Sequence, residues 1–480
     1  MRSELITLSR RLLSASNKAT ALFSEKDMTC KNSQIQVGWT RSSTLRDTRQ
    51  IGFTAPTTSG SSRHSRRKRW LITDEESHLI TFAPTGFGKG RSAIIPSLLK
   101  YPGSMLVIDP KGEAATVTAR RRRELGNDVV IIDPFKISTD TPDTFNPFDA
   151  INTTDMGIEE FSLLFPHLLH PDSGKGLPRE PFWDIKGDDL IAGITAMILS
   201  VCPEEERNIS KLRQAIKSGD VIMSLANQLD TVGAEMSPMA YENIAALVST
   251  EDKCRSSILA TAQQHFSIYA DPKVIESMST TSFDLEQFRD GNQPMTIYLV
   301  LPVTRLYSHA TLLRIWLSTL IAVLKSRKAR PQYSTLLIVD EAAQLGRMTS
   351  LLECMTLLRG YGVRVWSFWQ SMHQLYHLYG DEAEVILDNC GVIQTLGCNH
   401  NRNAKALSDM FGDNSSPEEF LSLPRGQQMV MTPKGRLEQL GSLDYLKDQQ
   451  YKGHFDPNPL YNTRKWTVRG TTKMKGRSAK

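Results

Sequence analysis

The chain has 480 residues, of which 40% are hydrophobic and 23% are charged, proportions typical of a soluble globular protein. This length exceeds one ordinary compact core and suits two domains with flexible ends. The longest apolar windows, Ile191–Cys202 and Pro294–Thr304, are shorter than the roughly 18 residues that a membrane-spanning helix needs, so we expect no transmembrane helix in this chain.

The net charge of +5 is unevenly distributed along the chain. Residues 1–70 contain 14 Lys or Arg and 4 Asp or Glu, and residues 464–480 contain 7 and none, so these ends carry +17 and leave −12 for the residues between them. We interpret residues 1–70 as a basic, flexible leader and linker and residues 446–480 as a basic tail. Such segments either contact phosphates of nucleic acid or lipid headgroups, or serve only as solvated linkers.

The six cysteines are scattered without a C-x-x-C pair. This pattern argues for a reducing compartment and against a disulfide framework or a zinc site. No apolar segment of the kind found in secretory signals follows the basic start of the chain.

An α/β pattern begins at residue 77, where short apolar segments alternate with helical ones. This alternation is typical of a parallel sheet that is covered on both faces. The predicted strands are His78–Ala83, Ser104–Asp109, Asp128–Asp133, Met295–Leu301, Leu336–Asp340, Val363–Trp369 and Val392–Leu396.

The first strand is followed by the sequence A-P-T-G-F-G-K-G at residues 83–90, which opens a helix as a Walker A phosphate loop does. Glycines allow backbone N–H groups to surround a phosphate, the helix N-terminus favours negative charge, and Lys89 reaches the β- and γ-phosphate oxygens. Gly90 stands where a Mg²⁺-binding Ser or Thr is usual, and Thr85, Ser92 or a water are the alternatives for that ligand. The predicted nucleotide-binding residues are Pro84, Thr85, Gly86, Phe87, Gly88, Lys89, Gly90 and Arg91.

Residues 150–290 interrupt the α/β pattern with a helical one. Helices are predicted at Asp184–Val201, Ile209–Ile216 and Met239–His265. We therefore expect one α/β domain, residues 71–149 and 291–445, with an all-helical insertion at 150–290. We also expect the α/β domain to fold without this insertion.

Two carboxylates end the apolar segment L-L-I-V at residues 336–339. A P-loop motor needs one carboxylate on the metal side and one to polarise the attacking water. We assign Asp340 to Mg²⁺, which it would hold through a water molecule, and Glu341 to the general base. Gln370 ends the next strand and is predicted to sense the γ-phosphate or to position water, and Asp109 either contacts the same region or only caps a helix.

These segments together resemble the TraG/TraD-type coupling proteins of type IV secretion and conjugation, which are relatives of the FtsK and HerA translocases. The resemblance covers about residues 77–430 and includes the matching sequences at residues 78–90, 102–113, 133–135, 145–148, 181–183, 336–345 and 370–371. It implies an α/β, RecA-like P-loop domain with an inserted all-α domain, assembled as a homohexamer that binds ATP and Mg²⁺ at subunit interfaces. A Gly after the Walker lysine is common in that family.

The resemblance also implies an arginine that completes the site of a neighbouring subunit. Arg359, which we expect on the helix after Asp340, matches that position best, and Arg364 is the second candidate. The implied partners are DNA, as a single-stranded transfer strand, a relaxase or effector protein, and the components of the secretion channel. Family members usually begin with two membrane-spanning helices, which this chain lacks, so we expect a bacterial cytoplasmic protein at the inner face of the inner membrane, held there peripherally.

The sequence therefore predicts an ATP-hydrolysing coupling protein that drives DNA or protein into a type IV secretion channel. One alternative is another hexameric DNA translocase of the FtsK or HerA kind. Another is an inactive ATP-binding remnant or adaptor, which Gly90 favours and Lys89, Asp340 and Glu341 oppose.

Overall fold

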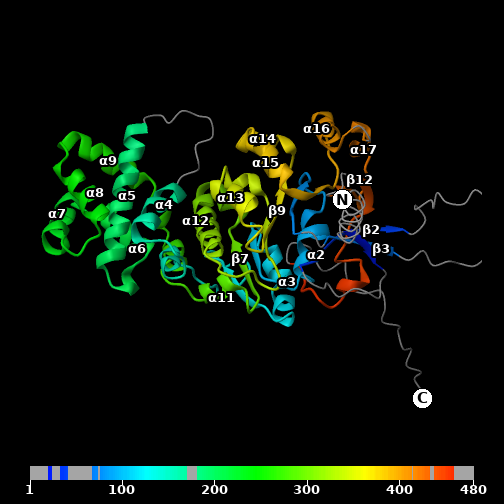
Figure 1. Cartoon of the computed structure of the whole chain (residues 1–480), viewed down its shortest axis with the longest axis horizontal. Coiled ribbons are helices and arrows are strands. Elements are labelled where there is room, and N and C mark those ends of the chain that lie inside the picture. The colour runs from blue at the N-terminus through cyan, green and yellow to red at the C-terminus, as the bar shows by residue number, and fades with distance from the viewer. Residues whose placement is uncertain are drawn as a thin grey trace, which may run out of the picture.

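The computed structural model describes residues 20–23, 33–41, 68–73, 76–169, 181–412, 415–432 and 437–458. A sheet of 12 strands, in the order β1-β3-β2-β12-β11-β10-β4-β9-β8-β5-β7-β6, lies at the centre of the molecule. A helical insertion extends from one end of the elongated molecule, and β2 and β3 lie at the other end (Figure 1).

The strands from β10 to β6 in this order are parallel, as the α/β pattern predicts. The parallel strands are β4 (His78–Phe82), β5 (Met105–Asp109), β6 (Asp128–Ile132), β7 (Met295–Val300), β8 (Thr335–Val339), β9 (Val363–Trp369) and β10 (Cys390–Thr395). Strands that extend the β10 edge in antiparallel orientation are β11 (Gln427–Met431), β12 (Leu437–Gly441), β2 (Ile35–Arg41), β3 (Lys68–Thr73) and β1 (Thr20–Phe23).

Both faces of the parallel strands are covered by helices. In β4, Ile80 and Phe82 join the core on the side of α12 to α16, whereas Leu79 joins the core on the side of α2 and α3. Burial on both faces explains why these strands are apolar throughout and do not alternate. The helices around the sheet are α2 (Ile95–Leu98), α3 (Glu113–Glu124), α12 (Leu306–Lys325), α13 (Thr349–Leu357), α14 (Met372–Tyr379), α15 (Glu382–Asp388), α16 (Asn401–Phe411) and α17 (Pro417–Leu421).

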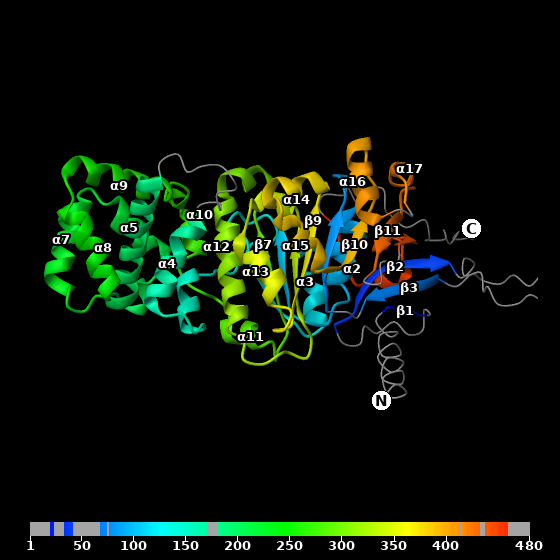
Figure 2. The same cartoon turned by 45° about the horizontal axis from the view of Figure 1, so that its top comes forward.

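Among the described residues, the regular elements of the insertion between β6 and β7 are all helices (Figure 2). The single helix predicted at Met239–His265 is wrong, because Thr250 and Glu251 adopt extended backbone angles and separate two helices. The helices of the insertion are α4 (Ile158–Leu169), α5 (Pro181–Val201), α6 (Ile209–Lys217), α7 (Val221–Val232), α8 (Pro238–Ser249), α9 (Asp252–Gln264), α10 (Pro272–Ser277) and α11 (Leu285–Asp290).

Helix α12 joins the insertion to the sheet. The buried side chain of Trp316 donates an Nε1–H bond to the carbonyl of Phe145 at 3.3 Å. The same apolar core contains Phe161 and Phe165 of α4 and continues to the parallel strands. The insertion and the sheet therefore share one core.

The segment Val303–Lys325, which contains α12, is also the one stretch of the described residues with the length and apolar composition of a membrane span. It has 23 residues and a mean hydropathy of 1.3, and 72% of its most apolar window is buried inside the protein. The sequence windows identified above missed this helix. Its burial against the sheet and the insertion explains its apolar composition.

Two expectations for the chain ends are wrong where the structure describes them. Ile35 and Val37, within the predicted leader, are buried in β2, and Trp39 of that strand pairs with Gly441. Within the predicted tail, Tyr451 is buried against α2 and α3. Serine- and arginine-rich flanks conceal the apolar β2 in the sequence. The remaining parts of these two segments, residues 1–19, 24–32, 42–67 and 459–480, lie outside the described residues.

Candidate active site

The predicted phosphate loop lies between β4 and the helix that continues as α2. Gly86 and Gly88 have φ values of +85° and +91°, a left-handed conformation that favours glycine. The Ala83 N–H donates to the Trp369 carbonyl at 2.8 Å, which ties the loop to the end of β9. The loop thus opens at the carboxyl edge of the sheet, where ligands bind in α/β proteins.

Lys89 and the acidic pair meet at this edge. The Lys89 Nζ atom lies 2.8 Å from Glu341 Oε1 and 4.0 Å from Asp340 Oδ1. The Gln370 Nε2–H donates to Glu341 Oε2 at 2.9 Å. Glu341 has φ +52° and ψ +47°, an uncommon conformation for a residue with a side chain, and it turns the carboxylate toward the loop. The structure thus brings together four residues from the predicted site.

The electrostatics differ between the two adjacent carboxyl groups. Burial raises the pKa of Asp340 to about 6, although the charge of Lys89 opposes this shift. Burial also acts to raise the pKa of Glu341, but the hydrogen bonds from Lys89 and Gln370 and the charges of Lys89 and Lys111 together outweigh it, so this pKa lies below its usual value. Glu341 is therefore the better ionised of the two in this arrangement.

A cavity of about 680 Å³ adjoins this cluster. Of the predicted nucleotide-binding residues, all except Pro84 line it. Arg91 forms a bidentate pair with Asp444, with N–O distances of 2.6 and 2.7 Å, and so connects the loop to the segment after β12. Ser92, one of the alternatives for the missing Mg²⁺ ligand, also lines the cavity, and its hydroxyl donates to the Gly88 carbonyl at 2.7 Å. Residues that line the cavity but were not assigned to the site are Trp39, Lys111, Glu113, Leu396, Leu423, Arg425, Gly426, Gln427, Ser442, Leu443, Asp444, Lys447 and Asp448.

Asp109 lies beside the site but acts as a cap. Its carboxylate accepts hydrogen bonds from the N–H groups of Ala115, at 2.8 Å, and Lys111, at 3.4 Å. Burial raises its pKa to about 7, and the charges of Asp340 and Glu113 add to this shift. Of the two roles considered for Asp109, the structure supports the cap.

The two arginine candidates lie at the opposite edge of the sheet. Arg359 is exposed in the turn after α13, before β9 begins, and not on the helix as predicted. Arg364 is fully buried and donates to the carbonyls of Ser33, at 2.7 Å, and Ser77, at 3.2 Å. Burial prevents Arg364 from reaching another subunit, so Arg359 remains the candidate.

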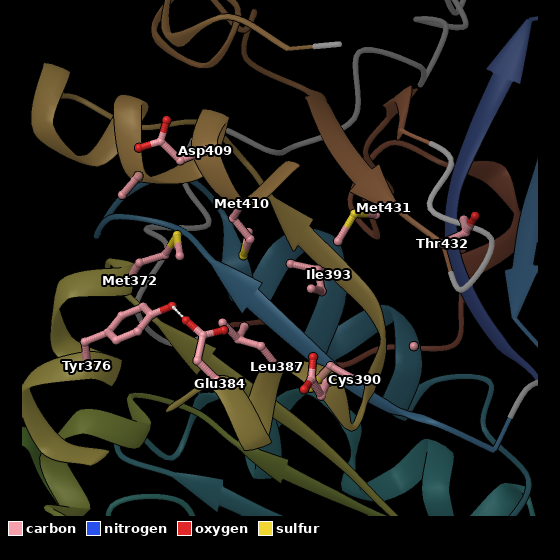
Figure 3. Close-up of a pocket in the computed structure, with 13 residues that line it drawn as sticks. Met372, Tyr376, Glu384, Leu387, Cys390, Ile393, Asp409, Met410, Met431 and Thr432 are labelled. Carbon is pink, nitrogen blue, oxygen red and sulfur yellow. Dashed lines mark hydrogen bonds between the residues drawn. The ribbon is translucent and has the colours of Figure 1, made fainter. Parts of the chain in front are cut away.

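A second cavity, of about 710 Å³, lies between α14, α15, α16 and β10 (Figure 3). Its described lining contains Glu384, Asp388 and Asp409 but no Lys or Arg. The Tyr376 hydroxyl donates to Glu384 at 2.6 Å. Because three carboxylates would repel a polyphosphate, this cavity does not fit a nucleotide.

Comparisons with known proteins agree with this geometry. The profile of a family described as type IV secretory system conjugative DNA transfer matches residues 35–440. The conjugal transfer protein TraG of Escherichia coli is 25% identical over 367 residues, which cover 72% of this chain and 56% of that protein. The coupling protein VirD4 of Bartonella quintana is 23% identical over 343 residues, which cover 70% and 53%. The chain spans about half the length of the curated relatives it matches.

Solved structures of the conjugative coupling protein TrwB share the fold. The complex with ADP and Mg²⁺ has a TM-score of 0.60 at 18% identity and covers 77% of this chain and 86% of that one. The unbound TrwBΔN70 has a TM-score of 0.59 at 17% identity, with coverage of 77% and 85%. The profile match over residues 35–440 shows that the chain belongs to the type IV secretory system conjugative DNA transfer family.

Proposed function

We propose that this protein is an ATP-hydrolysing coupling protein that drives DNA or protein substrate into a type IV secretion channel. The observation that carries the proposal is the cluster of Lys89, Glu341 and Gln370, whose side chains form hydrogen bonds of 2.8 and 2.9 Å. A cation on a phosphate loop, a carboxylate beside it and an amide at the next strand end are the parts that phosphoryl transfer to water needs.

The residues at this edge fit a nucleotide and Mg²⁺. Apart from its two chain neighbours, no described residue has a heavy atom within 4 Å of a Cβ placed on Gly86, so the loop is open toward the cavity. Lys89 and Lys111 supply positive charge to phosphates, and Asp340 would hold Mg²⁺. When bound, Mg²⁺ neutralises negative charge on the β- and γ-phosphate oxygens.

The Lys89–Glu341 ion pair suggests how these residues act in turn. A nucleoside triphosphate carries more negative charge than one carboxylate does. We therefore expect the Lys89 ammonium group to move from Glu341 to the phosphate oxygens. This releases Glu341 to accept a proton from the attacking water. The water oxygen bonds to the γ-phosphorus while the bond from that phosphorus to the ADP oxygen breaks, and Gln370 orients the water or the γ-phosphate.

The wider assembly is part of the same proposal. The relatives are a conjugal transfer protein and a type IV secretion system coupling protein. We therefore infer that this chain binds DNA, a relaxase or effector protein, and components of the secretion channel. A homohexamer would place Arg359 against a neighbouring subunit. Location at the inner face of the bacterial inner membrane follows from the proposed role, with the basic residues 1–70 as one peripheral contact.

The test is the ATPase rate with and without single-stranded and double-stranded DNA at several stated salt concentrations. We expect Mg²⁺-dependent hydrolysis that single-stranded DNA stimulates, more strongly at low salt. Stimulation only by double-stranded DNA would favour an FtsK-like or HerA-like translocase. Nucleotide binding without hydrolysis under every condition would identify an adaptor.

A further inference from the structure

Gly90 leaves the site without the hydroxyl that usually binds Mg²⁺ after the Walker lysine. A Cβ placed on Gly90 would lie 4.0 Å from both Glu113 carboxylate oxygens, which are the nearest described atoms outside its chain neighbours and its own helix. This space is therefore open and has a carboxylate on its far side. A hydroxyl at residue 90 would point into the volume that Glu113 adjoins.

The position of Glu113 is fixed from two sides. It is the first residue of α3, and the turn before it depends on Gly112, whose φ is +65° and whose Cβ would approach Ser138 to 3.1 Å. The side chain of Asn458, which is 6% exposed, donates to Glu113 Oε1 at 2.5 Å. Among the described residues no donor reaches Oε2, so this oxygen is available to a ligand.

Glu113 faces the same cavity as Lys89, Gly90, Asp340 and Glu341. Mg²⁺ prefers oxygen ligands and is commonly held by one or two carboxylates together with substrate phosphates and water. Asp340 is the carboxylate on the β8 side of the cavity. Glu113 is the carboxylate on the α3 side, next to the space that a side chain at residue 90 would occupy.

We propose that Glu113 replaces the missing Walker hydroxyl as the Mg²⁺ ligand on the phosphate-loop side of the site. This inference rests on the proposed function, because it assumes that the cavity binds Mg²⁺ with a nucleotide. A carboxylate differs from a hydroxyl in charge. Without Mg²⁺, Glu113 repels the phosphates, so nucleotide affinity should depend on Mg²⁺ more strongly than in a site with Ser or Thr.

The experiment measures Mn²⁺ affinity by electron paramagnetic resonance, with the full chain saturated with a non-hydrolysable ATP analogue. Glu113→Gln should weaken Mn²⁺ binding by roughly 10- to 100-fold, the range found when groups around a metal are altered. When EDTA removes divalent cations, the affinity of the Glu113→Gln protein for the ATP analogue should equal or exceed that of the wild type. Gly90→Thr combined with Glu113→Gln should recover Mn²⁺ binding at least in part, because the hydroxyl returns.

The matched control is Glu124→Gln, which removes the same charge at the exposed far end of α3 and should bind Mn²⁺ like the wild type. A folded Glu113→Gln protein with wild-type Mn²⁺ affinity would overturn the inference and leave the proposed function intact. If Glu113→Gln does not fold, Glu113→Asp keeps the charge and shortens the reach, and wild-type affinity there would overturn it equally. A wild-type chain that does not bind the analogue at all would overturn both.

Discussion

The ammonium group of Lys89 and the carboxylate of Glu341 form an ion pair 2.8 Å long between residues that are 252 positions apart in the sequence. Each residue neutralises the other while no phosphate is bound. In the proposed mechanism, the Glu341 carboxylate is thereby withheld from water until a nucleotide attracts Lys89 away. The two residues should consequently respond differently to substitution.

Lys89→Ala should abolish hydrolysis and weaken ATP binding by roughly 10- to 150-fold, because a hydrogen bond to a charged group contributes about 1.5–3 kcal/mol. Binding of a fluorescent ATP analogue and release of phosphate measure the two effects. Lys100→Ala is the control, because Lys100 contacts Gln450 outside the cavity. Wild-type turnover in Lys89→Ala would remove the phosphate-loop assignment.

Glu341→Gln should keep nucleotide binding but lose turnover by about 10²- to 10⁴-fold, the contribution typical of a general base. The glutamine can still accept a hydrogen bond from Lys89 or Gln370, so the geometry of the site should persist. Equilibrium binding and single-turnover hydrolysis separate the two quantities. A variant that loses binding instead would show that Glu341 holds the metal or the fold.

The sequence predicted the parallel strands because each is a short apolar segment with a turn after it. It also predicted Lys89, Glu341 and Gln370, since strand ends and a glycine-rich loop leave local signals. In the antiparallel extension, the place of β2 was missed because its contact with β12 is not local. Gly441, for example, is required by the Trp39 ring, which lies 2.3 Å from the position of a Cβ there. No local pattern indicates a pair that is separated by most of the chain.

The site residues that the sequence missed have a similar explanation. Glu113 comes four residues after Asp109, which was expected either to contact this region or to cap a helix, but only the fold places the Glu113 carboxylate beside Gly90. The capping role of Asp109 depends on the exact turn into α3. The position of Arg359 at the opposite edge depends on where α13 ends.

His78 should make stability depend on pH. It is fully buried in β4, where Nδ1 accepts the Val365 N–H at 2.9 Å. Burial lowers its pKa to about 4, and the charges of Arg364 and Arg359 add to this shift. As the pH falls from 6.5 toward 4, the unfolded chain takes up a proton that the folded chain refuses, so stability present above pH 6.5 is lost, by about 3 kcal/mol at pH 4.

The check is urea unfolding of the wild type and of His78→Asn, whose side-chain oxygen can still accept the Val365 N–H. Between pH 7 and pH 4, the free energy of unfolding of the variant should fall by about 3 kcal/mol less than that of the wild type. His373→Asn, at an exposed residue of α14, is the control and should follow the wild type. If the free energy of unfolding depends on pH equally in His78→Asn and the wild type, His78 is excluded as a source of acid sensitivity.

The shared core changes the expectation that the α/β domain folds without the insertion. Removal of residues 150–290 would expose the face of α12 that α4 covers, so we expect an insoluble product. Phe165→Ala should destabilise the whole chain by about 3–5 kcal/mol in one cooperative transition, whereas Leu163→Ala, at a 53% exposed residue, should cost under about 0.5 kcal/mol. A soluble deletion variant that binds ATP would show that the two parts fold separately.

Substitution of Arg359 tests whether subunits assemble into the proposed ring. Arg359 lies at the sheet edge opposite Glu341, so it can act only on the site of another subunit. Arg359→Ala and Lys89→Ala should each be inactive alone. A mixture of the two forms interfaces where an intact Lys89 meets an intact Arg359, and part of the activity should return, in a fraction that rises with protein concentration as assembly requires.

The alternative is that Arg359 is a surface residue whose contacts contribute about 0–1 kcal/mol, in which case Arg359→Ala keeps nearly full activity at any concentration. The matched control is Arg402→Ala, at an exposed residue of α16, which should retain wild-type activity when pure and in mixtures. Inactive mixtures, with co-assembly of the two variants verified by cross-linking, would exclude action across the interface. Arg364 would not then replace it, because its side chain is buried and bonded to two backbone carbonyls, so an arginine from another segment would have to be sought.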